Sequence, residues 1–310
     1  MNQKTAFIIN PAAGFGKTKK RIKTLAKLIK GIDPEAKILL TRHPLHAMSL
    51  AKHALKEGVL RLVVIGGDGT LNEVINGYFD GAGKAYNEHA SIAIVPSGTG
   101  SDFIRSIEHK KDLHEAIKFA LHAPAKPTDV GLVEATDTNG LKVKRYFINV
   151  SSAGLSGLVA GFMKTVTRKL GSTSAYFIAT VQAIRALKPS TLKITAEGFE
   201  QTIENCSLLS FANGQFFGSG MKIAPNARLD DGLFDVIGIK DLGALFFMVN
   251  GYRVYQGTHL ELANVQSYRH ATCTVTALTT EPVYIETDGE LFAQLPATYS
   301  VQHNAVLMVR

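Results

Sequence analysis

Apolar residues follow two different patterns along the 310-residue chain. In the first 125 residues, short apolar runs at 6–9, 37–40, 62–65 and 92–95 end at Asn10, Thr41, Gly66 and Pro96. Segments 17–30, 46–57, 70–78 and 112–122 carry their apolar residues at helical spacing. Strands separated by helices predict parallel βαβ units and a doubly wound α/β sheet.

The pattern changes near Pro124 and Pro127. Beyond Asp129, runs rich in Val, Ile, Phe and Thr predict strands at 145–150, 192–196, 208–212, 233–239, 272–278 and 283–287. Helix-like segments interrupt them at 155–169, 174–187 and 242–256. We therefore expect an α/β domain over 1–127 and a mainly-β sandwich over 128–310. The last predicted strand, 299–309, fits either domain.

Four polar or glycine-rich runs follow the predicted parallel strands, at 10–14, 41–44, 66–70 and 96–100. Ligands of doubly wound sheets bind beyond the carboxyl ends of the strands. All four runs would gather at that edge, and their convergence predicts a ligand site there.

The run Gly66-Gly67-Asp68-Gly69-Thr70 has the composition of a phosphate-binding loop. Glycines let backbone N–H groups face a phosphate, and the following helix N-terminus adds favourable charge. Thr70 and Asn72 can donate hydrogen bonds, whereas an ionised Asp68 only accepts, which suits Mg²⁺ or a hydroxyl group. The structural alternative is a tight Asp-Gly turn. A second run, PAAGFGKT at 11–18, resembles a Walker A loop but has Pro11 where that loop needs glycine.

Composition and charge narrow the class of protein. Hydrophobic residues make up 45% and charged residues 19%, which is globular composition. No membrane-span-length apolar run or signal peptide is visible, so we expect a cytoplasmic protein. The net charge is +8, and residues 1–30 contain eight basic residues and no acid, which favours anionic ligands. The chain lacks an aromatic-interleaved basic motif, so we expect no nucleic-acid partner.

Six motifs occur in order along the chain: NPAAGFGK (10–17), GGDGTLNEVINGY (66–78), VPSGTGSDF (95–103), DVG (129–131), NGQFFGSGMKIAPNARLDDGLFDV (213–236) and ETDGE (286–290). Together they resemble the diacylglycerol kinase catalytic-domain family, which includes sphingosine kinases and soluble bacterial lipid kinases. NAD kinases and phosphofructokinases share the GGDG motif in related form, so the first domain is expected to have their fold. The ordered set is more specific than GGDG alone. Ser101 departs from the family pattern, which often has Asn there.

The resemblance implies an ATP-dependent kinase that transfers the γ-phosphoryl group to the hydroxyl of diacylglycerol or a related lipid, with ATP bound between two domains. By motif match, the nucleotide contacts would be Asn10, Thr41, Gly66, Gly67, Asp68, Gly69, Thr70, Leu71, Asn72 and Thr99.

The resemblance also implies the catalytic residues and a metal site. Glu290 is our first choice for the base that accepts the lipid hydroxyl proton, with Asp288 adjacent in role. Asp68 competes, because the sphingosine kinase branch gives the base role to the GGDG aspartate. The run ARLDDGLF resembles the structural Mg²⁺ site of bacterial members, whose ligands here would be the carboxylate of Asp231 and the carbonyl oxygens of Arg228 and Leu233. A hairpin turn without metal is the alternative.

A lipid kinase must meet its substrate at a membrane, so we expect peripheral association. Two segments combine basic and apolar residues: 17–30, and 155–169. Each can equally pack its apolar face on a core. A homodimer is compatible with the sequence. Three other functions stay open: a kinase of a soluble acceptor resembling NAD kinase, a non-catalytic nucleotide- or lipid-binding regulator, and a nucleic-acid binder that uses the basic first helix.

Overall fold

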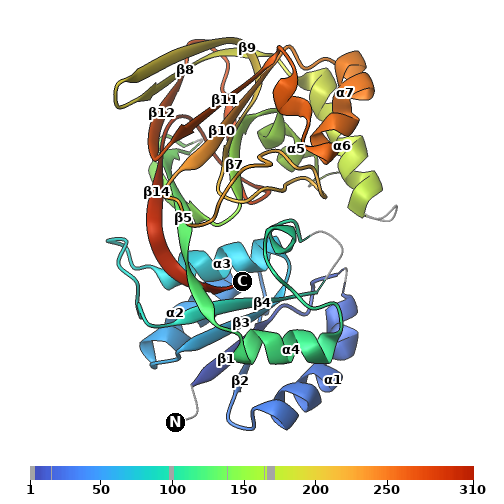
Figure 1. Cartoon of the computed structure of the whole chain (residues 1–310), viewed down its shortest axis with the longest axis vertical. Coiled ribbons are helices and arrows are strands. Elements are labelled where there is room, and N and C mark those ends of the chain that lie inside the picture. The colour runs from blue at the N-terminus through green and yellow to red at the C-terminus, as the bar shows by residue number, and fades with distance from the viewer. Residues whose placement is uncertain (1–3, 15, 98–100, 138, 164, 166–171) are drawn as a thin grey trace. The chain divides into compact units, whose positions relative to one another are not determined.

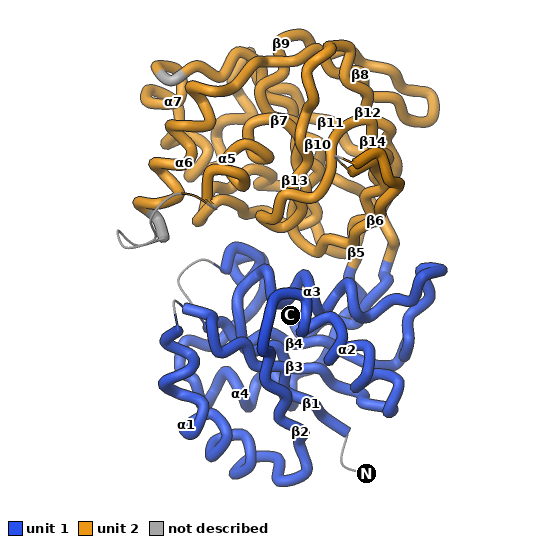
Figure 2. The backbone as a smooth tube through the Cα atoms, turned by 180° about the vertical axis from the view of Figure 1, so that it is seen from behind, with its two compact units in different colours: residues 1–128, 304–310 blue, residues 129–303 orange. Residues whose placement is uncertain are grey.

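The computed structural model describes residues 4–310 apart from 15, 98–100, 138, 164 and 166–171. The chain divides into two compact units, residues 1–128 with 304–310, and residues 129–303 (Figure 2). Two long strands, β5 (Ala125–Thr136) and β14 (Glu290–Val309), pass from one unit into the other. Each unit is described below by itself.

The first unit contains a parallel sheet in the order β2–β1–β3–β4, with the end of β14 beside β4 (Figure 1). Every residue of β1 and β3 is buried, since helices cover both faces of the sheet. The edge strand β2 is partly exposed. The strands are β1 (Thr5–Ile9), β2 (Lys37–Leu40), β3 (Arg61–Gly66) and β4 (Ser91–Pro96).

Helices α1 (Lys17–Ile32) and α4 (Leu113–His122) pack on one face of this sheet, where Leu25, Ile29 and Ile117 meet Phe7 and Val63. Helices α2 (His46–Lys56) and α3 (Asp68–Tyr78) contact each other and the opposite face. The apolar stripe of α1 is therefore part of the core. A short 3-10 helix, η1 (Phe103–Ser106), lies between β4 and α4.

The second unit is an antiparallel assembly of two strand layers. One ladder runs β11–β10–β9–β7–β13–β14, and β8 and β12 connect β9 to β14 on the other side. Aromatic side chains fill the space between the layers; Phe211 stacks on Tyr299, and Phe147 stacks on Phe234. The remaining strands are β6 (Lys142–Phe147), β7 (Val150–Gly154), β8 (Ser190–Ala196), β9 (Phe199–Ala212), β10 (Phe234–Lys240), β11 (Val265–His270), β12 (Thr272–Ala277) and β13 (Tyr284–Thr287).

Three helices, α5 (Leu155–Met163), α6 (Ser172–Ala186) and α7 (Ala244–Gln256), gather at one side of the second unit (Figure 1). They share a second core with β7, β9 and β10, in which Val159 and Ala183 meet Leu208 and Ile237. A second 3-10 helix, η3 (His259–Glu261), follows α7. Within the described part of the chain, no helix is both long and apolar enough to cross a bilayer.

Several predicted boundaries are wrong. The strand expected over 145–150 is broken, because β6 ends at Phe147 and β7 begins at Val150. The backbone N–H groups at the break bond to the carboxylate of Asp288, a partner 138 or more residues away that no local pattern indicates. The helix after Gly67 begins at Asp68 instead of residue 70, and the last strand begins at Glu290 instead of residue 299.

Gly77 tests the close packing of α2 on α3. A Cβ atom at Gly77 would overlap the carbonyl oxygen of Met48 in α2, and a backbone atom cannot move aside cheaply. We expect Gly77→Ala to lower the free energy of unfolding by roughly 2–3 kcal/mol. Gly31→Ala is the matched control, because no atom lies within 4 Å of its added Cβ. That variant should be as stable as wild type or more stable by about 0.5 kcal/mol. Urea unfolding followed by circular dichroism measures both; equal stability of the two variants would contradict the packing.

Candidate functional site

The carboxyl ends of the parallel strands in the first unit bring four predicted segments together. Thr41 donates its backbone N–H to Ile9 O (2.9 Å), and Asn10 donates to Ile65 O (3.0 Å). Ser97 donates in turn to Gly66 O (2.9 Å). The residues that follow β1, β2, β3 and β4 thus lie side by side along one edge of the sheet, as the topology predicts.

The loop after β1 is tied to the start of α3. Asn10 donates from Nδ2 to Oγ1 of Thr70 (2.9 Å), while its Oδ1 accepts from the N–H of Ala12 (2.9 Å). Gly66 is required for this approach, since a Cβ there would lie 2.7 Å from the Thr70 hydroxyl oxygen. The N-terminal turn of α3, which contains Gly69 and Leu71, begins directly after Gly67 with no side-chain cap from that residue. The first N–H groups of a helix and its dipole form an anion site.

Asp68, the first residue of α3, holds the loop that follows β4. Its carboxylate accepts from the backbone N–H of Asp102 (2.6 Å) and of Phe103 (3.4 Å). This contact joins the GGDG run to the third predicted motif, 95–103. Thr99 of that motif lies outside the described residues. Asn72 is fully buried in α3, and its side-chain oxygen and backbone carbonyl both accept from Asn76.

Glu73 contributes a contact that the sequence did not reveal. Its two carboxylate oxygens accept from the backbone N–H groups of Leu45 and Ala47 (both 2.9 Å) at the start of α2. Helix α2 begins at His46 without a cap of its own, and Leu45 has a left-handed backbone (φ 65°). An acid from α3 therefore caps α2 and holds the loop containing Thr41. The sequence did contain one indication of this contact. Leu45 precedes the helix where Ser, Thr, Asp or Asn would normally cap it, so the cap has to come from elsewhere.

In the second unit, Asp288 is engaged by the backbone. Its carboxylate accepts from three successive N–H groups, those of Ile148 (3.1 Å), Asn149 (3.0 Å) and Val150 (3.1 Å). Its own N–H donates to Val150 O (2.9 Å), and its backbone is left-handed (φ 47°). Asp288 thus fastens the turn after β13 to the break between β6 and β7.

Glu286, a buried acid close to Asp288, was not selected by the sequence analysis. It is 4% exposed; Oε1 accepts from Ser152 Oγ (2.6 Å), and Oε2 accepts from the N–H of Gly289 (2.7 Å). Burial raises the pKa of Glu286 to about 7, the two hydrogen bonds oppose the rise, and the charges of Asp288 and Glu290 add to it. The sequence did contain one indication of this acid, because Glu286 lies inside the predicted apolar strand directly before the DGE run.

Glu290 differs from both neighbouring acids. It is the first residue of β14, is exposed, and pairs with Thr287 through the backbone ladder. Among the described residues, none donates a hydrogen bond to its carboxylate. Asp288 and Gly289 (φ 87°) form a left-handed turn braced by Glu286, and this turn presents Glu290 at the surface of the unit. Of the acids at 286, 288 and 290, Glu290 has the carboxylate that is free to meet a substrate.

The predicted metal ligands lie in the turn before β10. Asp231 Oδ1 accepts from the N–H of Leu233 (3.2 Å), and Oδ2 is hydrogen-bonded to the guanidinium of Arg269. Arg269 also lies 3.8 Å from the carboxylate of Asp235. The turn is anchored by the buried Asp129, whose Oδ2 accepts from the N–H of Gly232 (2.7 Å).

The donor types at this turn suit a hard cation, but the carboxylate among them is already paired with a cationic side chain. The outer oxygen of Asp231 already bonds to a guanidinium, whose positive charge would repel a divalent ion. Arg269 supplies the compensating charge for Asp231 itself. The ligand set of Arg228, Asp231 and Leu233 therefore stays a prediction.

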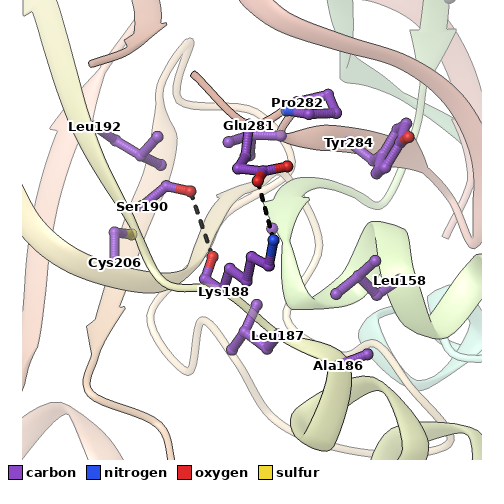
Figure 3. Close-up of a pocket in the computed structure, with 12 residues that line it drawn as sticks. Leu158, Ala186, Leu187, Lys188, Ser190, Leu192, Cys206, Glu281, Pro282 and Tyr284 are labelled. Atoms are coloured by element: carbon purple, nitrogen blue, oxygen red, sulfur yellow. Dashed lines mark hydrogen bonds and ion pairs between the residues drawn. The ribbon is translucent and has the colours of Figure 1, made fainter. Parts of the chain in front are cut away.

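The second unit also contains a pocket of about 230 Å³ (Figure 3). Apolar lining is supplied by Leu158 of α5, by Leu187 directly after α6, and by Leu192 of β8. Lys188 and Glu281 form an ion pair at the pocket (2.9 Å). Tyr284, another lining residue, begins β13, the strand that leads to Asp288 and Glu290.

Comparisons with known proteins agree with this arrangement. Residues 4–133 match the model of the diacylglycerol kinase catalytic domain, and residues 149–310 match the YegS C-terminal NAD kinase beta sandwich-like domain. The chain is 27% identical over 305 residues to the diacylglycerol kinase of Bacillus subtilis (strain 168), covering 96% of this chain and 93% of that protein. It is 24% identical over 310 residues to the diacylglycerol kinase of Mycobacterium tuberculosis (strain H37Rv), covering 99% and 95%.

Solved structures share the fold. A diacylglycerol kinase from Bacillus anthracis str. Sterne superposes with a TM-score of 0.71 at 22% identity, covering 99% of this chain and 96% of that one. Yeast NADH kinase complexed with NADH gives 0.53 at 10% identity, covering 99% and 83%. The predicted fold class, an NAD kinase-like α/β part followed by a β-sandwich, is confirmed.

Glu286 should make stability depend on pH. Its pKa rises from 4.5 in the unfolded chain to about 7 in the fold, so the folded form binds the extra proton between those values. The free energy of unfolding should therefore fall by on the order of 3 kcal/mol as pH rises from 4.5 to 7, and stay constant above.

Glu286→Gln should remove this dependence, because the amide can accept from Gly289 and donate to Ser152. We expect the variant to equal wild type near pH 4 and to exceed it in stability at pH 8. Glu281→Gln, which changes an exposed ion pair with Lys188, is the control and should leave the curve unchanged. Chemical denaturation across pH measures all three; parallel curves for wild type and Glu286→Gln would contradict the assignment.

Arg269 decides whether Asp231 is available to a metal. We expect the thermal midpoint of the wild type to be the same in Mg²⁺ and in chelator, because the guanidinium holds the carboxylate. Arg269→Gln should make the midpoint rise with added Mg²⁺. Lys193→Gln, which removes an exposed pair with Glu200, is the control. A wild-type midpoint that rises with Mg²⁺ and loses this response in Asp231→Asn would show that metal binds beside Arg269.

Proposed function

Because the chain belongs to the diacylglycerol kinase catalytic-domain family, with a YegS-type β-sandwich as its second part, we propose that it is an ATP-dependent lipid kinase. It transfers the γ-phosphoryl group of MgATP to a lipid hydroxyl, most directly that of diacylglycerol or a related lipid. The observation that carries the proposal is that the chain contains both an anion site built from glycines, in the first unit, and an exposed carboxylate, Glu290, in the second unit.

The donor end of the proposal rests on the first unit. Gly66, Gly67 and Gly69 keep side chains away from the N-terminus of α3, so that its N–H groups can receive phosphate oxygens. Asn10 and Thr70 hold each other beside it (2.9 Å), and the Thr41 loop lies on the neighbouring strand. Phosphoryl transfer depends on positioning and charge neutralisation more than on covalent help from the protein. Mg²⁺ enters as part of the nucleotide substrate.

The acceptor end rests on the second unit. The carboxylate of Asp288 accepts hydrogen bonds from three backbone N–H groups, and Glu286 is buried. Glu290 is exposed and takes the role of the base that accepts the hydroxyl proton. Asp68 keeps its loop in place through Asp102, so we assign it a positioning role for the nucleotide site.

The pocket beside β13 supports a lipid acceptor over a soluble one. Its lining includes Leu158, Leu187 and Leu192, and it lies at the start of the four-residue strand that ends next to Asp288. A strand of four residues spans about 13 Å. An acyl chain in this pocket would therefore lie within reach of a headgroup hydroxyl at the Glu290 turn.

Kinase assays on three acid variants test the roles. Transfer from radiolabelled ATP should occur to vesicles containing diacylglycerol. Glu290→Gln should lower kcat by about 10²–10⁴ with unchanged stability, since it removes only the proton acceptor. Asp288→Asn should lower both activity and stability, the latter by about 1–3 kcal/mol, because an amide cannot satisfy all three N–H groups. Glu204→Gln, at an exposed position on β9, is the control.

The panel of acceptors separates the proposal from its alternatives. It should contain diacylglycerol, a sphingoid base, phosphatidylglycerol and NAD. Transfer to NAD alone would replace the lipid acceptor by a soluble one, and no transfer to any acceptor would leave a binding protein instead of a kinase. Full activity of Glu290→Gln would overturn the base assignment while sparing the kinase.

A further inference from the structure

Helix α7 is apolar around its whole circumference. Its sequence, ALFFMVNGYRVYQ, contains a single charged residue, Arg253. A helix with this composition is normally buried on all sides, whereas a surface helix turns charged residues outward. In this protein only one side of α7 is buried.

The inner side of α7 belongs to the core of the second unit. Phe246 and Phe247 pack against the cluster that contains Ile239 and Leu242. The helix is also held near its C-terminal end, because Val254 O accepts from the N–H of Lys222 (2.9 Å). It ends at Gly257, whose left-handed backbone (φ 77°) lies against Pro225. These contacts fix which face of α7 points outward.

The outer face of α7 carries five large apolar or aromatic side chains at helical spacing. Their exposed fractions are 50–77%, and they are Leu245, Met248, Val249, Tyr252 and Tyr255. Leu141 and Leu278, two other strongly exposed leucines of this unit, stand singly in loops, and Phe177 is exposed on α6. Scattered exposed residues need no explanation, but a continuous stripe on one helix indicates an interaction site.

The two segments that could be expected to meet a membrane have their apolar residues in the core. Leu25 and Ile29 of α1 are buried against the parallel sheet, and Leu155 and Val159 of α5 are buried against β7 and β9. Residues 164 and 166–169 of the second segment lie outside the described part. Among the described helices, α7 is therefore the one that leaves an apolar face exposed instead of burying it in a core.

We propose that the outer face of α7 inserts into the interfacial layer of a lipid bilayer and holds the enzyme at the membrane that contains its substrate. The inference rests on the proposed lipid kinase function. Tyrosines are enriched where protein meets the headgroup layer, and Tyr252 and Tyr255 lie one turn apart beside the aliphatic residues.

The size of the face favours a bilayer over a second copy of the chain. A stable dimer buries about 800 Å² and 20–30 residues on each partner, far more than five side chains on one helix. A bilayer needs no complementary shape. The charged residues near this face are also compatible with a bilayer. None of α5, α6 and α7 contains an acid, and Arg253, the charged residue of α7, lies 3.9 Å from Glu261. Insertion should therefore depend on apolar burial and only weakly on anionic lipid.

Vesicle sedimentation of the full chain tests the proposal. Wild type should bind vesicles of neutral phosphatidylcholine containing diacylglycerol. Leu245→Ser with Met248→Ser should weaken binding about tenfold or more, because each buried large apolar side chain contributes strongly to partition. Leu141→Ser with Leu278→Ser is the matched control, changing two equally exposed leucines elsewhere in the unit, and should bind as wild type.

Fluorescence gives a second, direct measurement, because the natural chain contains no tryptophan. Met248→Trp should show a blue shift and protection from aqueous quenchers when vesicles are added, whereas Leu141→Trp should not. No spectral change at 248, or equal binding by the α7 and control variants, would overturn the proposal. So would a dimer that the α7 changes dissociate while vesicle binding stays unchanged.

Activity separates this inference from the function on which it rests. The α7 double variant should lose activity on diacylglycerol in vesicles but keep it on a short-chain diacylglycerol dissolved as monomers. Equal loss on both would mean that α7 acts on the site itself and not on membrane contact, which overturns the inference. If wild type phosphorylates neither form, the kinase proposal fails, while sedimentation and fluorescence still report whether α7 inserts.

Discussion

The carboxylate of Asp288 accepts three consecutive backbone N–H groups at the break between β6 and β7, and the chemistry of the second unit depends on this contact. Buried N–H groups must be paired, and here a side chain replaces the strand ladder as their partner. The contact separates β6 from β7 and fixes the left-handed turn after β13. It also occupies the carboxylate of Asp288 itself. Glu286 braces the same turn from beneath through Gly289. As a result, of the acids at 286, 288 and 290, only Glu290 is left exposed.

In the first unit, too, polar side chains form hydrogen bonds that hold neighbouring loops. Asp68 accepts from the N–H groups that follow β4, Glu73 accepts from those that start α2, and Asn10 reaches the Thr70 hydroxyl. Asp68, Thr70 and Glu73 of the glycine-rich motif thus each contact a neighbouring loop at the carboxyl edge of the sheet. The glycines keep the helix N-terminus open, and the acids determine the position of the segments around it. Some motif residues that the sequence suggests as nucleotide-binding residues therefore position the residues that would contact the nucleotide.

The second unit shows why apolar patterning and burial have to be examined separately. Segments 17–30 and 155–169 combine apolar and basic residues, and the described apolar side chains of both enter cores. Helix α7 lacks the polar outer face of an ordinary surface helix, so no alternation in its sequence distinguishes its two sides. The contacts of Phe246, Phe247 and Val254 turn one side inward, and the outward side then remains apolar. The exposed face results from packing, which is why periodicity alone did not identify it.

The sequence by itself determined the class of fold, the family and the alternation of strands and helices in the first unit, because these depend on local apolar runs, helical spacing and ordered motifs. It also placed the glycine-rich loop after the right strand. Only the tertiary structure decided which acids are engaged and which are exposed. Asp288, Glu73 and Asp231 each meet partners far away in the chain, respectively the turn at 148–150, the start of α2 and Arg269. Hydrogen bonds and ion pairs of that kind depend on three-dimensional proximity, which the spacing of residues along the chain does not contain.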